Sequence, residues 1–152
     1  MQLLIAAVGR IKAGPLADLQ SEYVKRLGGS IAIKEVEERR ALPSEQRKAR
    51  EGKLLLSALP EDAFVVALDE CGKVLASTAF AERMQRWQTD GAKSLAFVIG
   101  GADGLARPVV ERAGLILSLG AMTWPHLLAR ILLLEQLYRA QQILNRHPYH
   151  RE

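Results

Sequence analysis

The fold is decided by residues 95–104, which read LAFVIGGADG. Five apolar residues in a row predict a short strand that is buried on both faces of a sheet. The two glycines that follow permit positive φ and let a ligand approach bare amide groups. Their spacing matches neither GxGxxG nor GxxxxGK[ST], so the loop is not a known phosphate cradle. By itself this loop is better explained as a plain turn.

A second strand-to-loop junction follows in the chain. The apolar run from Leu115 to Leu119 leads into a loop made of Gly120, Ala121, Met122, Thr123, Trp124 and Pro125. Open parallel sheets bind their ligands outside the carboxyl ends of the strands, where the connections leave towards opposite faces. Two glycine-bearing loops at neighbouring strand ends therefore favour a ligand site there.

The rest of the chain alternates strands with helices. Further strands are expected at 3–8, 31–36 and 63–68, the last followed by a turn at Gly72. Helices are expected after Pro15, after Ser44, after Ser77, after Pro108 and from Pro125 to Arg146, with Ser44 and Ser77 as N-caps. The alternation predicts an α/β fold, a mostly parallel sheet with helices on both faces, in a single domain over residues 1–152.

Composition narrows the class of protein. The 152 residues are 49% hydrophobic and 25% charged, as in a globular domain, and the net charge of +4 favours a polyanionic partner without demonstrating one. We see no membrane span and no signal peptide, so we expect a cytoplasmic protein without a membrane partner. Cys71 is alone, which excludes an internal disulfide, and His147 and His150 lack the further ligands of a metal site.

The expected last helix is unusually apolar. Its large apolar residues are too many for one stripe, so a second face needs a cover, either another subunit or the protein's own loops. Two charged residues interrupt it, and they are best explained as a buried structural pair, Arg130 with Glu135.

The chain ends in HPYHRE, residues 147–152. Most chain ends fray and carry no function. This one combines two imidazoles, a phenol and a guanidinium, which together offer proton transfer, base stacking and phosphate pairing. The tail is therefore either a frayed end or a set of groups that acts on a nucleic acid.

With these motifs in view, the sequence resembles the ribosomal RNA large subunit methyltransferase H family of the SPOUT superfamily. The resemblance covers essentially the whole chain and is carried by LIAAVG (4–9), ALDECGK (67–73), FVIGGADG (97–104), LSLGAMTWPH (117–126) and NRHPYHRE (145–152). The last three motifs together are specific to the family.

The resemblance implies an α/β trefoil knot, S-adenosylmethionine as methyl donor and no metal. It also implies a homodimer that methylates N3 of a pseudouridine in large-subunit ribosomal RNA, within the ribosome, with no role for DNA. It places the cofactor against Leu68, Gly100, Gly101 and residues 120–125. Backbone groups of the last loop are expected to bind the adenine, Leu68 to pack on the ligand, and Gly101 to leave room for it.

The acceptor gives the tail a chemical role. N3 of a pseudouridine carries a proton at neutral pH, and that proton must leave as the bond to the methyl carbon forms. The candidates are His150 as base or hydrogen-bond partner, Tyr149 as a stacking platform and Arg151 as a contact to phosphate or to a base oxygen.

Two other functions fit the same residues. One is a nucleotide- or flavin-binding α/β module without methyl transfer. The other is an RNA-binding ribosome-assembly factor that keeps the fold and lacks catalysis. Tight binding of S-adenosylmethionine would exclude the first, and methylation of ribosomal RNA from a strain that lacks the gene would exclude the second.

Overall fold

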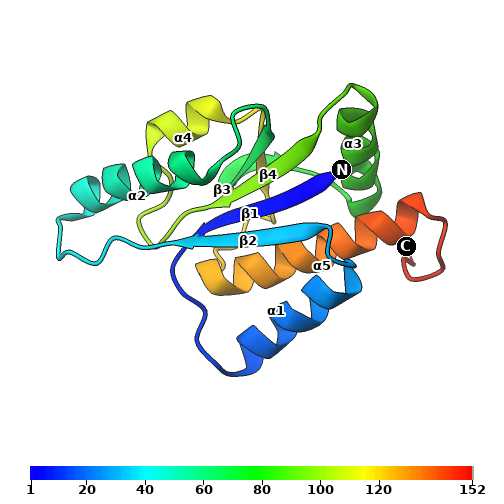
Figure 1. Cartoon of the computed structure of the whole chain (residues 1–152), viewed down its shortest axis with the longest axis horizontal. Helices are drawn as coiled ribbons and strands as arrows, with labels where there is room; N and C mark the ends of the chain where they lie inside the picture. Colours follow the sequence, from blue (N-terminus) through cyan, green and yellow to red (C-terminus); the bar gives the residue numbers. More distant parts are fainter. Residues whose placement is uncertain (152) are drawn as a thin grey trace.

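A parallel sheet forms the centre of the molecule. The structure is a computed structural model that describes residues 1–151. Its five strands have the order β2-β1-β4-β3-β5 (Figure 1). They are β1 (Gln2–Val8), β2 (Ile31–Val36), β3 (Phe64–Val74), β4 (Ser94–Ile99) and β5 (Leu115–Ser118). All four strand pairs are parallel, which confirms the predicted α/β class.

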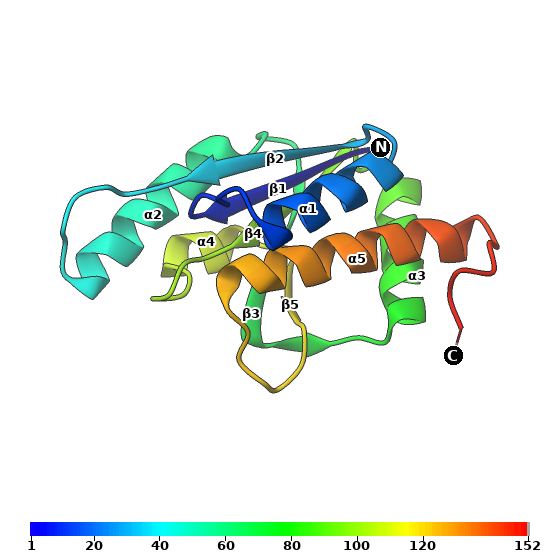
Figure 2. The same cartoon turned by 90° about the horizontal axis from the view of Figure 1, so that it is seen from below.

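Helices cover the sheet on both faces, as predicted. They are α1 (Pro15–Arg26), α2 (Ser44–Ala58), α3 (Ser77–Thr89), α4 (Arg107–Arg112) and α5 (His126–Leu144). One apolar cluster joins the sheet to α1, α3 and α5, and a second joins it to α2 and α4. Figure 2 shows α1 and α5 side by side along the sheet.

The alternation of side chains along β1 shows why this strand is apolar throughout. Leu3, Ile5 and Ala7 belong to the cluster under α1, α3 and α5. Leu4 and Ala6 point the other way, into the cluster under α2 and α4. A strand that is buried on both faces needs an apolar residue at every position, because successive side chains alternate between the faces.

β3 is longer than the sequence predicts. The apolar run 63–68 and the following Gly72 predicted a strand and then a turn, but β3 continues to Val74 and shifts its register against β5. A Cβ atom at Gly72 would lie 2.7 Å from the carbonyl oxygen of Ile116. The predicted turn was wrong. Gly72 lies within the strand, where the absence of a side chain lets the neighbouring backbone of β5 approach closely.

Ser44 and Ser77 begin their helices but do not cap them. The N-cap residues are Pro43 and Ala76, without side-chain cap hydrogen bonds. The Ser44 hydroxyl donates to the Asp103 carboxylate at 3.1 Å. The Ser77 hydroxyl donates to a side chain of α5 at 2.6 Å. The predicted capping roles were wrong because each hydroxyl joins its helix to a distant part of the chain instead.

α5 is the longest helix and packs against both α1 and α3. Leu133, Leu134 and Leu137 are fully buried in this packing. Within residues 1–151, no helix is long and apolar enough to cross a membrane. The trefoil knot that the resemblance implies depends on how the chain threads from β5 into α5, and it stays a prediction.

Candidate functional site

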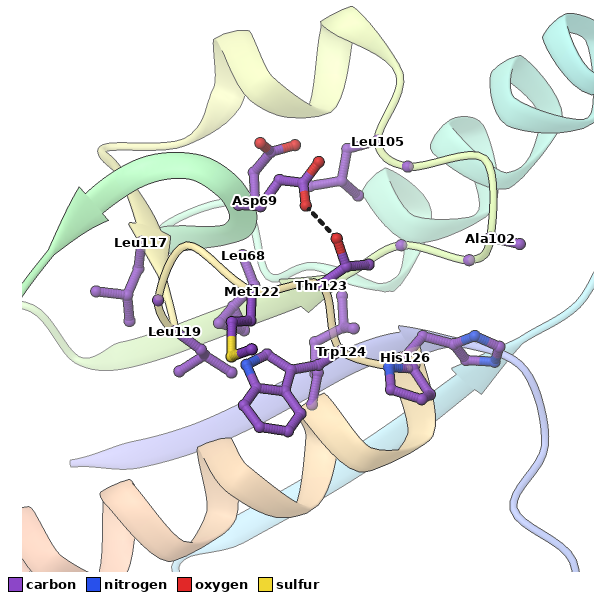
Figure 3. A pocket seen from close by; sticks show the side chains of 18 residues that line it. Leu68, Asp69, Ala102, Leu105, Leu117, Leu119, Met122, Thr123, Trp124 and His126 are labelled. Atoms are coloured by element: carbon purple, nitrogen blue, oxygen red, sulfur yellow. Dashed lines mark hydrogen bonds between the residues drawn. The ribbon is translucent and has the colours of Figure 1, made fainter.

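A cavity of about 580 Å³ opens where β4 and β5 end, beside residues 68–70 in the middle of β3. Its wall contains every residue predicted to hold the cofactor except Ala121, namely Leu68, Gly100, Gly101, Gly120 and 122–125. Figure 3 shows the labelled side chains around it, with Trp124 and His126 at the start of α5. The structure therefore brings the two predicted loops and the middle of β3 to one place, while Ala121 is exposed outside the wall.

The loop after β4 is compact because its glycines allow close contacts. The Gly104 amide donates to the carbonyl of Gly101 at 3.1 Å, and the two residues form an isolated bridge. A Cβ atom on Gly100 would lie 2.8 Å from the carbonyl oxygen of Gly104. A Cβ atom on Gly101 would lie 3.0 Å from Val8 and 3.3 Å from Glu51. Gly101 thus lacks a side chain because β1 and α2 pack directly behind it.

The loop after β5 is ordered by two side chains. Ser118 both accepts from the Gly120 amide at 3.1 Å and donates to the Gly120 carbonyl at 2.9 Å. Gly120 has a φ of 121°, which side chains other than hydrogen rarely tolerate. Thr123 donates to the Glu70 carboxylate at 2.9 Å and so ties this loop to β3 (Figure 3).

His126 lines the same cavity and was not predicted. It is the first residue of α5 and lies beside Gly9, where an added Cβ would be 3.0 Å from the imidazole Nε2. Burial lowers the pKa of His126, and the neighbouring Arg130 lowers it further, so the ring is neutral at pH 7. Its position directly after the predicted loop was the available signal.

Arg130 anchors the first turns of α5 to the elements packed beneath them. Its side chain is fully buried and donates to Glu35 at 2.6 Å, to Gln20 at 3.2 Å and to the carbonyl of Gly9 at 3.2 Å. Burial disfavours the charged form of Glu35, but hydrogen bonds from Arg130 and from the Ile11 amide outweigh it and hold the pKa of Glu35 below its ordinary value. This network joins α5 to α1, β2 and the loop after β1.

The predicted pair of Arg130 with Glu135 was wrong. Residues five apart on a helix point in different directions, because each residue turns the helix by about 100°. Glu135 instead accepts from Arg139 at 2.7 Å and from the hydroxyl of Tyr149 at 2.6 Å. It therefore binds the tail rather than Arg130.

The tail folds back on α5 instead of fraying. Tyr149 lies edge-on to Tyr138, with ring centroids 4.8 Å apart, and under the guanidinium of Arg139 at 4.9 Å. Arg139 also contacts Nδ1 of His150 at 3.2 Å. The hydrogen bond to Glu135 and burial raise the pKa of Tyr149 to about 12, so the phenol stays neutral. Glu152, the last residue of the tail motif, lies outside the described residues.

The tail and the cavity are separate within one chain. Neither Tyr149, His150 nor Arg151 lines the cavity. A second cavity of about 310 Å³ lies between them, sharing Gly120 and Trp124 with the first and reaching Glu135. The structure thus gathers the predicted cofactor residues in one site and the predicted acceptor residues in another.

The chemistry of the cavity wall suits an organic cation better than an anion or a metal. Leu68, Met122 and Trp124 offer apolar surface, and the loops offer main-chain groups. The acidic side chains Asp69 and Glu70 also line the wall, next to a neutral imidazole. Among the described residues, no cluster of three histidine, cysteine or acidic side chains could hold a metal ion.

Comparisons with known proteins agree with the resemblance. Residues 1–150 match the family described as "Predicted SPOUT methyltransferase". The Ribosomal RNA large subunit methyltransferase H of Paramagnetospirillum magneticum is 57% identical over 151 residues, 99% of either chain.

Solved structures share the fold at low identity. A probable methylase family protein from Haemophilus influenzae superposes with a TM-score of 0.56 at 13% identity, covering 99% of this chain and 70% of that one. A Ribosomal RNA small subunit methyltransferase E from Neisseria gonorrhoeae, bound to S-adenosyl methionine, gives 0.50 at 14% identity, covering 95% and 66%.

Proposed function

Because this chain belongs to the SPOUT methyltransferase family, we propose that it is an enzyme that transfers a methyl group from S-adenosylmethionine to large-subunit ribosomal RNA. One observation carries the proposal, the cavity in which the two glycine loops meet the middle of β3. The full-length identity with a large-subunit enzyme supports the choice of RNA. N3 of a pseudouridine is the acceptor that the sequence motifs favour.

The residues of the cavity fit S-adenosylmethionine. The adenine needs apolar surface and main-chain hydrogen bonds, which Leu68, Trp124 and the loop 120–125 supply. The sulfonium and the ammonium are cations, which the carboxylates of Asp69 and Glu70 attract and the neutral His126 does not repel. When bound, the cofactor supplies an activated methyl group.

The protein then has two tasks, which are to align the reactants and to stabilise the charge that develops on the base. Methyl transfer requires the acceptor nitrogen, the methyl carbon and the sulfur in line. The cavity fixes the donor. Tyr149 stacks on the base, His150 contacts its reacting edge and Arg151 pairs with phosphate, so the tail fixes the acceptor. An Arg151→Ala variant should bind RNA more weakly and with a smaller salt dependence.

A homodimer brings the two halves of the site together. Within one chain the tail lies on the Glu135 side of α5, away from the cavity. Leu128 and Leu132 stay partly exposed on α5, and a second copy of this helix would cover them. The tail of one subunit then serves the cavity of the other. Leu132→Glu places a charge in this seam and should give a monomeric mass by light scattering, whereas a monomeric wild type would refute the dimer.

The function is tested in two steps. Titration calorimetry should show binding of S-adenosylmethionine, and its failure would favour a module without methyl transfer. Mass spectrometry of ribosomal RNA should show one methylated pseudouridine in cells that carry the gene and none in cells that lack it. Binding without methylation would favour an assembly factor.

A methylation assay with the purified enzyme identifies the substrate form and the place of action. Free RNA, isolated large subunits, whole ribosomes and DNA are offered to the enzyme in parallel. We expect methylation within the ribosome, and therefore in the cytoplasm, with no activity on DNA.

A further inference from the structure

Glu135 and Arg139 hold the tail through two successive residues, Tyr149 and His150. Glu135 is bound by Arg139 through one carboxylate oxygen and by the hydroxyl of Tyr149 through the other. Arg139 reaches onward to Nδ1 of His150 at 3.2 Å. The side chains of the Arg139–Glu135 pair are 24% and 19% exposed, so solvent screens the pair less than an ion pair at the open surface.

The contact between Arg139 and His150 determines where the imidazole carries its proton. A guanidinium has five N–H donors and no acceptor. Nδ1 of His150 must therefore accept this hydrogen bond, and in the neutral ring the proton must be on Nε2. A proton on Nδ1 would point at a group that can only donate. The geometry leaves Nε2–H as the ring atom that can meet another molecule.

We propose that Glu135 and Arg139 are positioning residues that hold His150 as the Nε2-protonated tautomer, so that His150 donates a hydrogen bond to the RNA base and does not remove its proton. The inference rests on the proposed function, in which the tail serves the acceptor. It decides between the two roles, base or hydrogen-bond partner, that the sequence left open for His150.

A donor has a clear task in this reaction. The N3 lone pair forms the bond to the methyl carbon, the electrons of the broken C–S bond stay on sulfur, and the N3 proton leaves to solvent water. Negative charge grows on the two carbonyl oxygens beside N3 as the proton departs. A hydrogen bond from Nε2–H to one of these oxygens strengthens as that charge grows, so it lowers the barrier rather than the ground state.

The contacts of Tyr149 support a fixed tail. Its phenol donates to Glu135 and keeps its proton, because that hydrogen bond raises the pKa of Tyr149 to about 12. The ring also contacts the Tyr138 ring, with centroids 4.8 Å apart, and the Arg139 guanidinium at 4.9 Å. A phenol held by these contacts restricts the next residue, His150, to the side where Arg139 can reach it.

The tautomer can be measured in the full-length protein without RNA. The chain has three histidines, so nitrogen-15 NMR of the labelled protein resolves each ring, and His147→Gln and His150→Gln assign the signals. We expect His150 with an unprotonated, hydrogen-bonded Nδ1. Arg139→Met should convert it to the mixture of tautomers of a free imidazole, and Arg139→Lys should restore part of the wild-type signal.

Arg86→Met is the matched control. Arg86 is an exposed arginine on α3, and among residues 1–151 its side chain makes no hydrogen bond. This variant should keep the wild-type tautomer. A His150 ring with its proton on Nδ1, or the same spectrum in the wild type and in Arg139→Met, would overturn the proposal whatever the enzyme's activity.

Kinetics separate the donor from the base. A glutamine amide donates a hydrogen bond but cannot take a proton, so His150→Gln should keep a tenth or more of the wild-type kcat if His150 is a donor, while His150→Ala loses about 100-fold. Equal loss in both variants would overturn the donor role. A wild type without activity on ribosomal RNA would instead refute the proposed function and leave the NMR result standing.

Discussion

The two ends of α5 are built in different ways. At its start, His126 lies against Gly9, and the completely buried guanidinium of Arg130 binds the Gly9 carbonyl as well as Glu35 and Gln20. At its end, Glu135 and Arg139 meet the tail through side chains that remain partly exposed. The first end holds a cavity whose shape depends on backbone positions. The second end holds the phenol of Tyr149 and the imidazole of His150 through hydrogen bonds that fix where each group carries its proton.

This contrast teaches which changes are informative at each end. Backbone groups are present whatever the side chain, so the cofactor end tolerates substitutions that keep the loops in place. Side-chain hydrogen bonds vanish with their atoms, so the tail end depends on residue identity.

Removal of the tail should have the largest effect. Deletion of residues 149–152 should lower methyl transfer by about 100-fold or more, because it removes every group proposed to touch the acceptor. Affinity for S-adenosylmethionine should not change, since these residues do not line the cavity. Loss of the docking hydrogen bonds should cost about 1–2 kcal/mol of stability. Calorimetry and a methylation assay check the separation, and full activity of the truncated enzyme would end the tail hypothesis.

Loss of Arg130 should be the most destabilising single change. Arg130→Met removes the hydrogen bonds of a completely buried guanidinium but leaves Glu35 partly exposed to water, so we expect a cost of about 2–3 kcal/mol and a Tm lower by about 6 °C. The exposed pair Arg26–Glu22 is the matched control, because Arg26→Met should cost under about 1 kcal/mol. A smaller loss in Arg130→Met than in the control would contradict the role of Arg130.

The Arg130 contribution should also depend on pH. The folded-state pKa of Glu35 lies below its ordinary value, so the ionised carboxylate adds stability above the unfolded pKa. That stability is lost as the pH falls through the folded pKa. The gap in Tm between wild type and Arg130→Met should therefore narrow in acid, below a pH of about 4. A gap that is constant down to pH 3 would exclude Glu35 as the responsible partner.

The two glycine loops should respond differently to added side chains. Gly101→Val pushes against Val8 and Glu51, so we expect overpacking of about 1–3 kcal/mol and about tenfold weaker binding of S-adenosylmethionine. Gly120→Ala meets open space but must adopt a φ of 121°, which costs about 1–3 kcal/mol through strain alone. Calorimetric titration of both variants checks this. Unchanged affinity in a folded Gly101→Val variant would remove the first loop from the site.

Glu51 should give the smallest effect. Burial raises the pKa of this carboxyl, Asp103 raises it further, and one of its oxygens has no hydrogen-bond partner among the described residues. Ionised Glu51 therefore destabilises the fold above its folded pKa, and the cost disappears as the pH falls below the unfolded pKa. Glu51→Gln should be more stable than wild type by about 1 kcal/mol at pH 7.5 and should lose this advantage at pH 4. Urea unfolding measures both, with exposed Glu111→Gln as the unaffected control.

The sequence predicts the parts of the molecule that depend on local signals. Apolar runs and glycines mark the ends of β4 and β5, and these ends do meet in one cavity. Sequence-based prediction fails where the role of a residue depends on a contact with a distant part of the chain. Gly72 packs against the backbone of β5 instead of forming a turn, and Ser77 binds a side chain of α5 instead of capping its own helix. Arg130 pairs with Glu35, which lies 95 positions away.

The tail also shows that residue types can indicate a function without revealing the contacts that position them. Its residue types indicated chemistry on RNA, but no pattern in six residues reveals that Tyr149 binds Glu135 or that Arg139 reaches His150. Those contacts depend on the chain turning back at Arg146, which adopts a left-handed φ of 57° that is unusual for a residue other than glycine.

The buried guanidinium of Arg130 also bears on how the chain folds. Its partners Glu35, Gln20 and Gly9 lie 95, 110 and 121 positions earlier in the chain. During synthesis these three groups must wait for α5 before they can bind Arg130, and contacts so far apart in sequence are slow to form. We therefore expect α5 to pack over α1 late in folding. Substitution of Arg130 should then mainly speed unfolding and change the folding rate little.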